Sequence, residues 1–199
     1  MSYLMEKIAR LHASVFGTIE RVLDGWFLGL LARFVFAAVL WMYFLNSART
    51  KVGVGLLGFF TVSDNAYYQI ALPAVEAAGG DVSQVSFIPW GAMVWAGTYA
   101  EFVLPVLIVL GLFARIAALG MSAFIAVQSI VDVTVHAVGP ETIGSLFDRF
   151  PDAAILDQRL LWVFPLVYVA VRGAGAISLD ALLSRGRTRA HGAVAAPAG

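Results

Sequence analysis

The sequence predicts an all-α integral membrane protein: a four-helix bundle with an amphipathic interfacial helix at its N-terminus. Three observations support this fold class. Of the 199 residues, 60% are apolar and only 13% are charged, whereas soluble proteins are about half apolar and about a quarter charged. The mean hydropathy is +0.84, and the apolar residues gather in blocks of about 20 residues, enough to cross a bilayer. Residues 1–25 instead mix apolar and charged side chains with a helical period.

The segment 1–25 is predicted to be an amphipathic helix. Its apolar residues recur three or four positions apart, and its charged residues fall largely on the rest of the helix surface. The order of basic and apolar residues differs from that of a cleaved signal peptide. We expect this helix to lie along the membrane surface. The apolar set comprises Leu4, Ile8, Leu11, Val15, Ile19 and Val22.

Residues 26–183 are predicted to form the membrane domain. The expected spans are 26–46, 90–113, 114–138 and 159–174, and an external loop, 47–89, separates the first two. The last segment, 184–199, is expected to be a disordered basic tail. Basic residues predominate on the side that holds both ends of the chain, and acidic residues predominate in the loops of the other side. The positive-inside rule therefore predicts that both termini are cytoplasmic.

Two charged residues fall within the predicted spans. Glu101 is near the middle of the second span, and Arg33 is about 10 Å above the inner end of the first, at about 1.5 Å per residue. Charged side chains at membrane depth usually face the protein interior and mark functional sites. We expect Arg33 and Glu101 to form an intramembrane ion pair and take both as candidate catalytic residues. The alternative is that the pair only fixes the register of the helices.

A polar stripe follows the third predicted span. Gln128, Asp132 and His136 are each four residues apart and therefore share one helix face. Asp132 and His136 fall near the outer surface, level with Lys51 and Arg159. These five residues are predicted to form an outer polar cluster that binds a ligand or relays protons. The alternative is that His136 is a hydrogen-bonded structural residue.

The residue types argue against several cofactors and partners. The chain has no cysteine, so no iron–sulfur cluster or thiol redox chemistry is expected. A bis-histidine haem needs two facing histidines, and only His136 lies in a predicted span. No set of histidines and carboxylates has the spacing of a zinc site. Thirteen basic residues balance thirteen acidic ones, which leaves no electrostatic footprint for nucleic acid.

Three motifs add a resemblance. The run from Ala100 to Leu119, which contains Glu101, the run from Arg172 to Asp180 with its Gly-x-Gly-x-x-Ser-Leu-Asp pattern, and the run from Leu31 to Phe34 with the later Lys51 are all similar to motifs of one family. They resemble the DoxX family. This resemblance implies a four-helix protein of the bacterial inner membrane that is associated with a membrane redox system.

The leading hypothesis is an accessory subunit of a membrane oxidoreductase system, in which these candidate residues hold a quinone-like ligand or relay protons. The cofactor itself stays open; a quinone is compatible because quinones need only an apolar slot with a few hydrogen-bonding groups. Any catalytic role would belong to a complex rather than to a stand-alone enzyme. The expected partners are the lipid bilayer and a protein subunit, and a homo-oligomer stays open. One alternative is a non-catalytic assembly subunit that recruits a partner protein. A second is a small-solute transporter.

Overall fold

The computed structural model describes residues 2–55 and 57–185. These residues are largely helical and form no β-sheet, which confirms the all-α class. Most of the predicted tail, 184–199, lies outside the described residues.

Four helices of the described chain are long and apolar enough to cross a membrane. α2 (Phe27–Arg49) ends three residues later than the predicted span, and α6 (Ala114–Thr134) ends four residues earlier. The other two are α5 (Ala92–Leu110), which continues the turn η3 (Phe87–Gly91), and α8 (Arg159–Arg172), which continues the turn η4 (Ala154–Gln158). These four helices are the mark of a multi-pass membrane protein.

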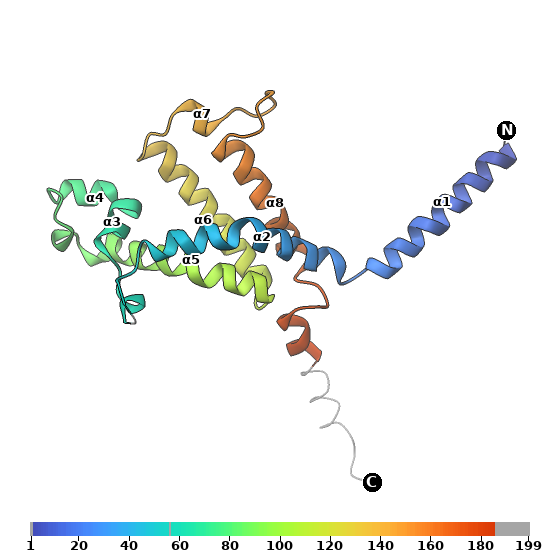
Figure 1. Cartoon of the computed structure of the whole chain (residues 1–199), viewed down its shortest axis with the longest axis horizontal. Helices are drawn as coiled ribbons and strands as arrows, with labels where there is room; N and C mark the ends of the chain where they lie inside the picture. The colour runs from blue at the N-terminus through green and yellow to red at the C-terminus, as the bar shows by residue number, and fades with distance from the viewer. Residues whose placement is uncertain (1, 56, 186–199) are drawn as a thin grey trace, which may run out of the picture.

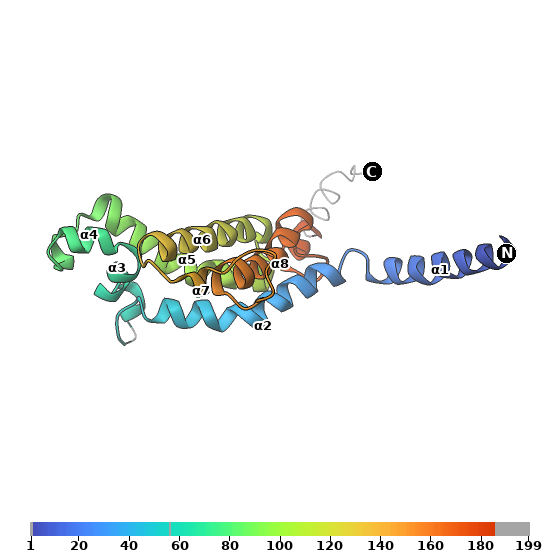
Figure 2. The ribbon, with the colours of Figure 1, turned by 90° about the horizontal axis from the view of Figure 1, so that it is seen from above.

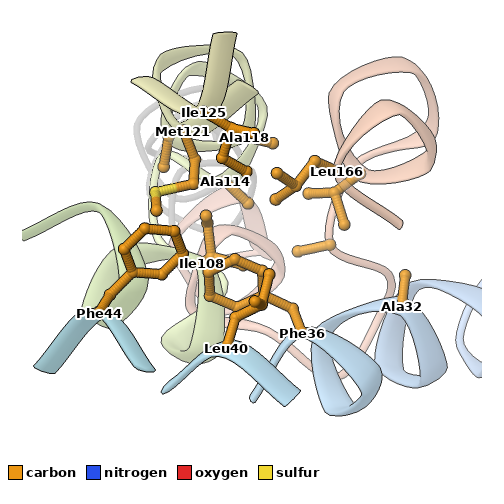
Figure 3. Packing of buried hydrophobic residues seen from close by; sticks show 13 residues of the cluster. Ala32, Phe36, Leu40, Phe44, Ile108, Ala114, Ala118, Met121, Ile125 and Leu166 are labelled. Carbon is orange, nitrogen blue, oxygen red and sulfur yellow. The ribbon is translucent and has the colours of Figure 1, made fainter. Parts of the chain in front are cut away.

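Each of the four helices packs against two of the others. α2 contacts α5 and α8, and α6 contacts the same two helices, so the four close into a ring. Figure 3 shows the side chains that fill its interior. Many apolar side chains on the outside of the helices are exposed, as expected for helices that face lipid. The buried core includes Phe36, Leu40 and Phe44 of α2, Ile108 of α5, Ala118, Met121 and Ile125 of α6, and Leu166 of α8.

α5 and α6 are joined by a tight turn. Gly111 ends α5 with a φ of 67°, a left-handed conformation that glycine adopts without strain. Only residues 111–113 separate the two helices, which makes them antiparallel neighbours, as predicted. In Figure 1 they diverge from this turn.

The segment between α2 and α5 carries short helices. They are α3 (Asp64–Ile70), α4 (Leu72–Ala77) and the single turns η1 (Gly58–Phe60) and η2 (Val82–Gln84). None of them is long enough to cross a membrane. α3 packs on α5. A further short helix, α7 (Pro140–Ile143), lies between α6 and η4.

The first helix, α1 (Ser2–Leu23), extends away from the ring in both views (Figures 1 and 2). Its apolar side chains are exposed, with Leu4 and Leu11 at 64% and 66%. α3 and α4 lie at the opposite end of the molecule (Figures 1 and 2). We call these the α1 end and the α3 end. The helix α1 lies in the segment 1–25, where the sequence predicts a helix. Its location on a membrane surface stays a prediction.

Candidate functional site

A buried ion pair joins the end of α2 to the middle of α5. Lys51 follows the last turn of α2, and its Nζ lies 2.9 Å from Oε2 and 3.0 Å from Oε1 of Glu101. The Lys51 and Glu101 side chains are only 3% and 6% exposed. Lys51 Nζ also donates to Ser47 Oγ at 2.7 Å. Charges can be buried in this way because each has a close partner of opposite sign and hydrogen bonds as well.

The expected Arg33–Glu101 ion pair is therefore wrong. The guanidinium of Arg33 donates to backbone carbonyls at the α1 end: Nε to Ile108 O at 3.1 Å, and Nη2 to Val109 O. The last carbonyls of a helix have no partner within the helix, and the C-terminal end of its dipole attracts a cation. A planar group with five donors satisfies several of them at once. Nη1 completes the set with Ala174 O and Ile177 O.

The error in the predicted pairing came from the assumed level of the helix ends. The prediction places Trp26 at the inner end of the first span and Trp90 at the outer end of the second, about 30 Å apart, which puts Arg33 within reach of Glu101. The guanidinium reaches instead to Ile108 and Val109, in the last turn of α5. The first turns of α2 must then extend beyond the end of α5. Glu101 precedes Val109 in α5 and lies about 12 Å from it along the helix axis, at about 1.5 Å per residue.

A second ion pair joins α6 to the start of α8. Arg159 Nη2 lies 2.5 Å from Asp132 Oδ2, and Nη1 donates to Ser129 Oγ at 2.9 Å. Arg159 is buried at 7% exposure. The predicted proximity of Asp132 and Arg159 is confirmed. Their contact fixes α8 against α6, which gives the pair a structural role beside any functional one.

The rest of the predicted stripe on α6 makes contacts with other elements. Gln128 Nε2 donates to Tyr43 Oη at 3.0 Å. His136, two residues beyond α6, places Nε2 3.3 Å from the carbonyl oxygen of Gln69 in α3. Gln128 Oε1 and Thr98 Oγ1 are buried and have no hydrogen-bond partner among the described residues.

These polar side chains meet at a cavity of about 500 Å³ between α5 and α6, where the two helices diverge, beside α3. Five of the seven predicted site residues line it, whereas Arg33 and Arg159 do not. Most of the lining is apolar. The polar lining is Lys51 with Ser47, Glu101, Gln69, Gln128, Asp132 and His136.

Small residues keep the cavity open. Gly97 of α5 and Gly120 of α6 both line it, together with Ala100 and Ala123. A Cβ on Gly97 would lie 3.2 Å from Ile70 Cδ1, so glycine also lets α3 approach α5 closely. Glu101 therefore has a ligand-sized space beside it, lined by the small residues of α5 and α6.

A second cavity, of about 340 Å³, lies against another side of α5. It is lined by apolar side chains, among them Trp41, Phe59 and Phe102, and by Glu101. Phe59 packs edge to face on Phe102 and on Tyr99. Glu101 thus lines both cavities. Ser47, Gln69 and this second cavity were missed from the sequence, because they come from segments far apart in the chain.

The Gly-x-Gly-x-x-Ser-Leu-Asp motif, which ends at Asp180, makes structural contacts at the α1 end. The carboxylate of Asp180 accepts from Phe113 N at 2.8 Å and from Ala114 N at 3.0 Å, which caps the start of α6. Ser178 Oγ accepts from Ala181 N at 3.2 Å, which is the contact of a helix cap. A Cβ on Gly111 would lie 3.0 Å from Arg33 Cζ, so glycine makes room for the guanidinium.

Among residues 2–55 and 57–185, no three His, Asp or Glu side chains are grouped so that they could hold a metal ion. The fold and site define a class: an all-helical protein with four helices able to cross a membrane and a lateral cavity beside a buried Lys–Glu pair. Comparisons with models of protein families, with curated proteins and with solved structures find no match to this chain.

Proposed function

We propose that this protein is a membrane-embedded subunit of an oxidoreductase system and that the cavity between α5 and α6 binds a quinone-like ligand. One observation carries the proposal: an apolar cavity of about 500 Å³ with polar side chains on two facing helices. Ligand pockets have volumes of this order and are mostly apolar, with a few polar groups that orient the ligand. The resemblance to the DoxX family points to the same class of protein and to the bacterial inner membrane.

The polar groups suit a flat ligand with oxygens at opposite edges. Lys51 and Glu101 lie on the α2–α5 side of the cavity, and Gln128, Asp132 and His136 lie on the α6 side. Lys51 Nζ and the His136 ring are the groups that would donate hydrogen bonds to those oxygens. When bound, a quinone supplies two-electron redox chemistry coupled to protons. Glu101 is the group that would hold a proton there. A partner subunit would supply the electron carrier.

Filling the cavity tests this proposal. Ala123→Phe places a ring in the cavity, whereas Ala126→Phe puts the same ring three residues farther along α6, outside the cavity lining. Both alanines are exposed, so neither change disturbs the core. Binding of a short-chain ubiquinone analogue to the full-length protein in lipid nanodiscs is followed by quenching of tryptophan fluorescence. We expect Ala123→Phe to weaken binding about tenfold or more, equivalent to 1.4 kcal/mol.

The control and a second variant define the outcome. Ala126→Phe should bind as the unchanged protein does. Glu101→Gln should still bind the ligand, but its affinities for the reduced and the oxidised ligand should no longer change with pH. Absence of saturable binding, or equal weakening by both phenylalanine variants, contradicts a ligand site in this cavity.

A second candidate function rests on α1. This helix extends away from the ring (Figures 1 and 2), and its apolar residues are exposed. A non-catalytic assembly subunit could use such a helix to lie on the membrane surface or to recruit a partner protein. This alternative predicts that deleting residues 2–21 abolishes assembly of the complex, while Ala123→Phe leaves both assembly and electron transfer unchanged.

A further inference from the structure

Two arginines line an open pocket of about 520 Å³ at the α1 end of the ring. Arg115 lies in the first turn of α6, and Arg172 is the last residue of α8. The two helices pack against each other. A Cβ built on Gly173 would lie 3.4 Å from Arg115 Nε, so the guanidinium of Arg115 lies against the backbone just after Arg172.

Neither Arg115 nor Arg172 has an ion pair or hydrogen bond within the described residues. The carboxylate of Asp180 lines the same pocket, but it accepts from the backbone N–H groups at the start of α6. Arg172 also lines a second cavity, next to α1, and the lining of that cavity includes Glu20, Arg21 and Asp24. Two arginines therefore line one pocket, and no carboxylate of the described residues forms an ion pair with either of them.

Apolar side chains surround these charges. Phe113 and Ile116 line the pocket and are 61% and 72% exposed. Val171, which precedes Arg172, is 65% exposed. A positive charge at the end of an apolar helix lies at the depth of the lipid head groups, and the apolar residues beside it lie at the depth of the acyl chains.

We propose that Arg115 and Arg172 bind the phosphate group of an anionic phospholipid, whose acyl chains lie on Phe113 and Ile116. Guanidinium groups match the geometry of phosphate oxygens and form two parallel hydrogen bonds with them. Basic pockets between the ends of membrane helices bind lipid head groups in this way. Free phosphate has the same head-group chemistry but would gain nothing from Phe113 and Ile116, which is why the lipid is favoured.

The test measures retention of phosphatidylglycerol by the full-length protein in nanodiscs of phosphatidylcholine, counted by native mass spectrometry. The variants are Arg115→Gln, Arg172→Gln and the double variant. Arg149→Gln is the matched control, because it removes the same charge in the segment between α7 and α8, away from the pocket. We expect the affinity for phosphatidylglycerol to fall about fivefold for each arginine and about 25-fold for both, at about 1 kcal/mol per charge.

Two further measurements make the outcome decisive. Replacing both arginines by lysine keeps the charge and should restore most of the retention, which also shows that the pocket still folds. Inorganic phosphate is added as a competitor and should displace the lipid only weakly. Unchanged retention in the double glutamine variant, an equal loss in Arg149→Gln, or binding of inorganic phosphate as tight as that of the lipid overturns the proposal.

Discussion

At the scale of residues, two basic side chains, Arg33 in α2 and Lys51 just after it, have different roles. Lys51 neutralises Glu101 at membrane depth, with Ser47 as a further hydrogen-bond partner. Arg33 instead caps the end of α5 through backbone carbonyls. Each contact suits the chemistry of its side chain: an ammonium is a compact charge that suits one carboxylate, and a guanidinium spreads five donors over several acceptors.

Double-mutant cycles test this pairing. Removing either Lys51 (Lys51→Met) or the charge of Glu101 (Glu101→Gln) leaves the other charge buried, and each single change should destabilise the protein by about 3–5 kcal/mol. The double variant should lose less than the sum, which gives a coupling of about 1–3 kcal/mol. Arg33→Met and Glu101→Gln should instead add to within about 0.5 kcal/mol. Reversible unfolding in mixed micelles measures these free energies. Strong coupling between Arg33→Met and Glu101→Gln would instead support an Arg33–Glu101 pair.

At the scale of elements, the ends of the helices are tied together by the chain beyond α8. Gly111 turns the chain from α5 to α6, Asp180 caps the first backbone N–H groups of α6, and Arg33 covers the last carbonyls of α5. Asp180 N in turn donates to Gly111 O at 2.9 Å. The part of the motif from Ala174 to Asp180 therefore acts as a clamp on the α5–α6 turn, and these contacts have a structural explanation that does not need a substrate.

Removing the cap on α6 should loosen this clamp. Asp180→Ala leaves the N–H groups of Phe113 and Ala114 without an acceptor, and we expect a loss of about 1–2 kcal/mol in the free energy of unfolding. Asp180→Asn keeps one acceptor oxygen and should lose less. Amide hydrogen exchange at residues 113–117 gives a local readout, in which faster exchange is expected for the alanine variant alone. Equal exchange in all three proteins would show that the cap is dispensable.

At the scale of the whole molecule, the balanced net charge divides into separate regions. Seven of the 13 acidic residues lie in the segments between α2 and α5 and between α6 and α8, whereas Arg115 and Arg172 lie at the α1 end, where the α5–α6 turn and the end of α8 meet. The positive-inside rule then predicts that the α1 end faces the cytoplasm. The two ion pairs between the helices, Lys51–Glu101 and Arg159–Asp132, are toward the other end.

The absence of cysteine makes the orientation directly testable. Ser14→Cys in α1 and Ser83→Cys in the turn η2, between α4 and α5, each introduce one thiol at an exposed position. In intact cells that express the full chain, a membrane-impermeant maleimide should label Ser83→Cys and should label Ser14→Cys only after lysis. The reverse pattern would place α1 outside, and labelling of both positions in intact cells would contradict the single span, α2, that the assigned topology places between them.

The sequence by itself determined the helices and their apolar character, because hydrophobic blocks of about 20 residues need no knowledge of distant neighbours. It also identified Glu101, Gln128, Asp132 and His136, since charged and polar groups at membrane depth are rare enough to stand out. Only the tertiary structure decided which partner each one has. A shift of a few residues in the level of two helices moved Arg33 from Glu101 to the carbonyls of α5 and brought Lys51 to Glu101. Pairing depends on such offsets, and they arise from packing among all four helices and the segments that connect them.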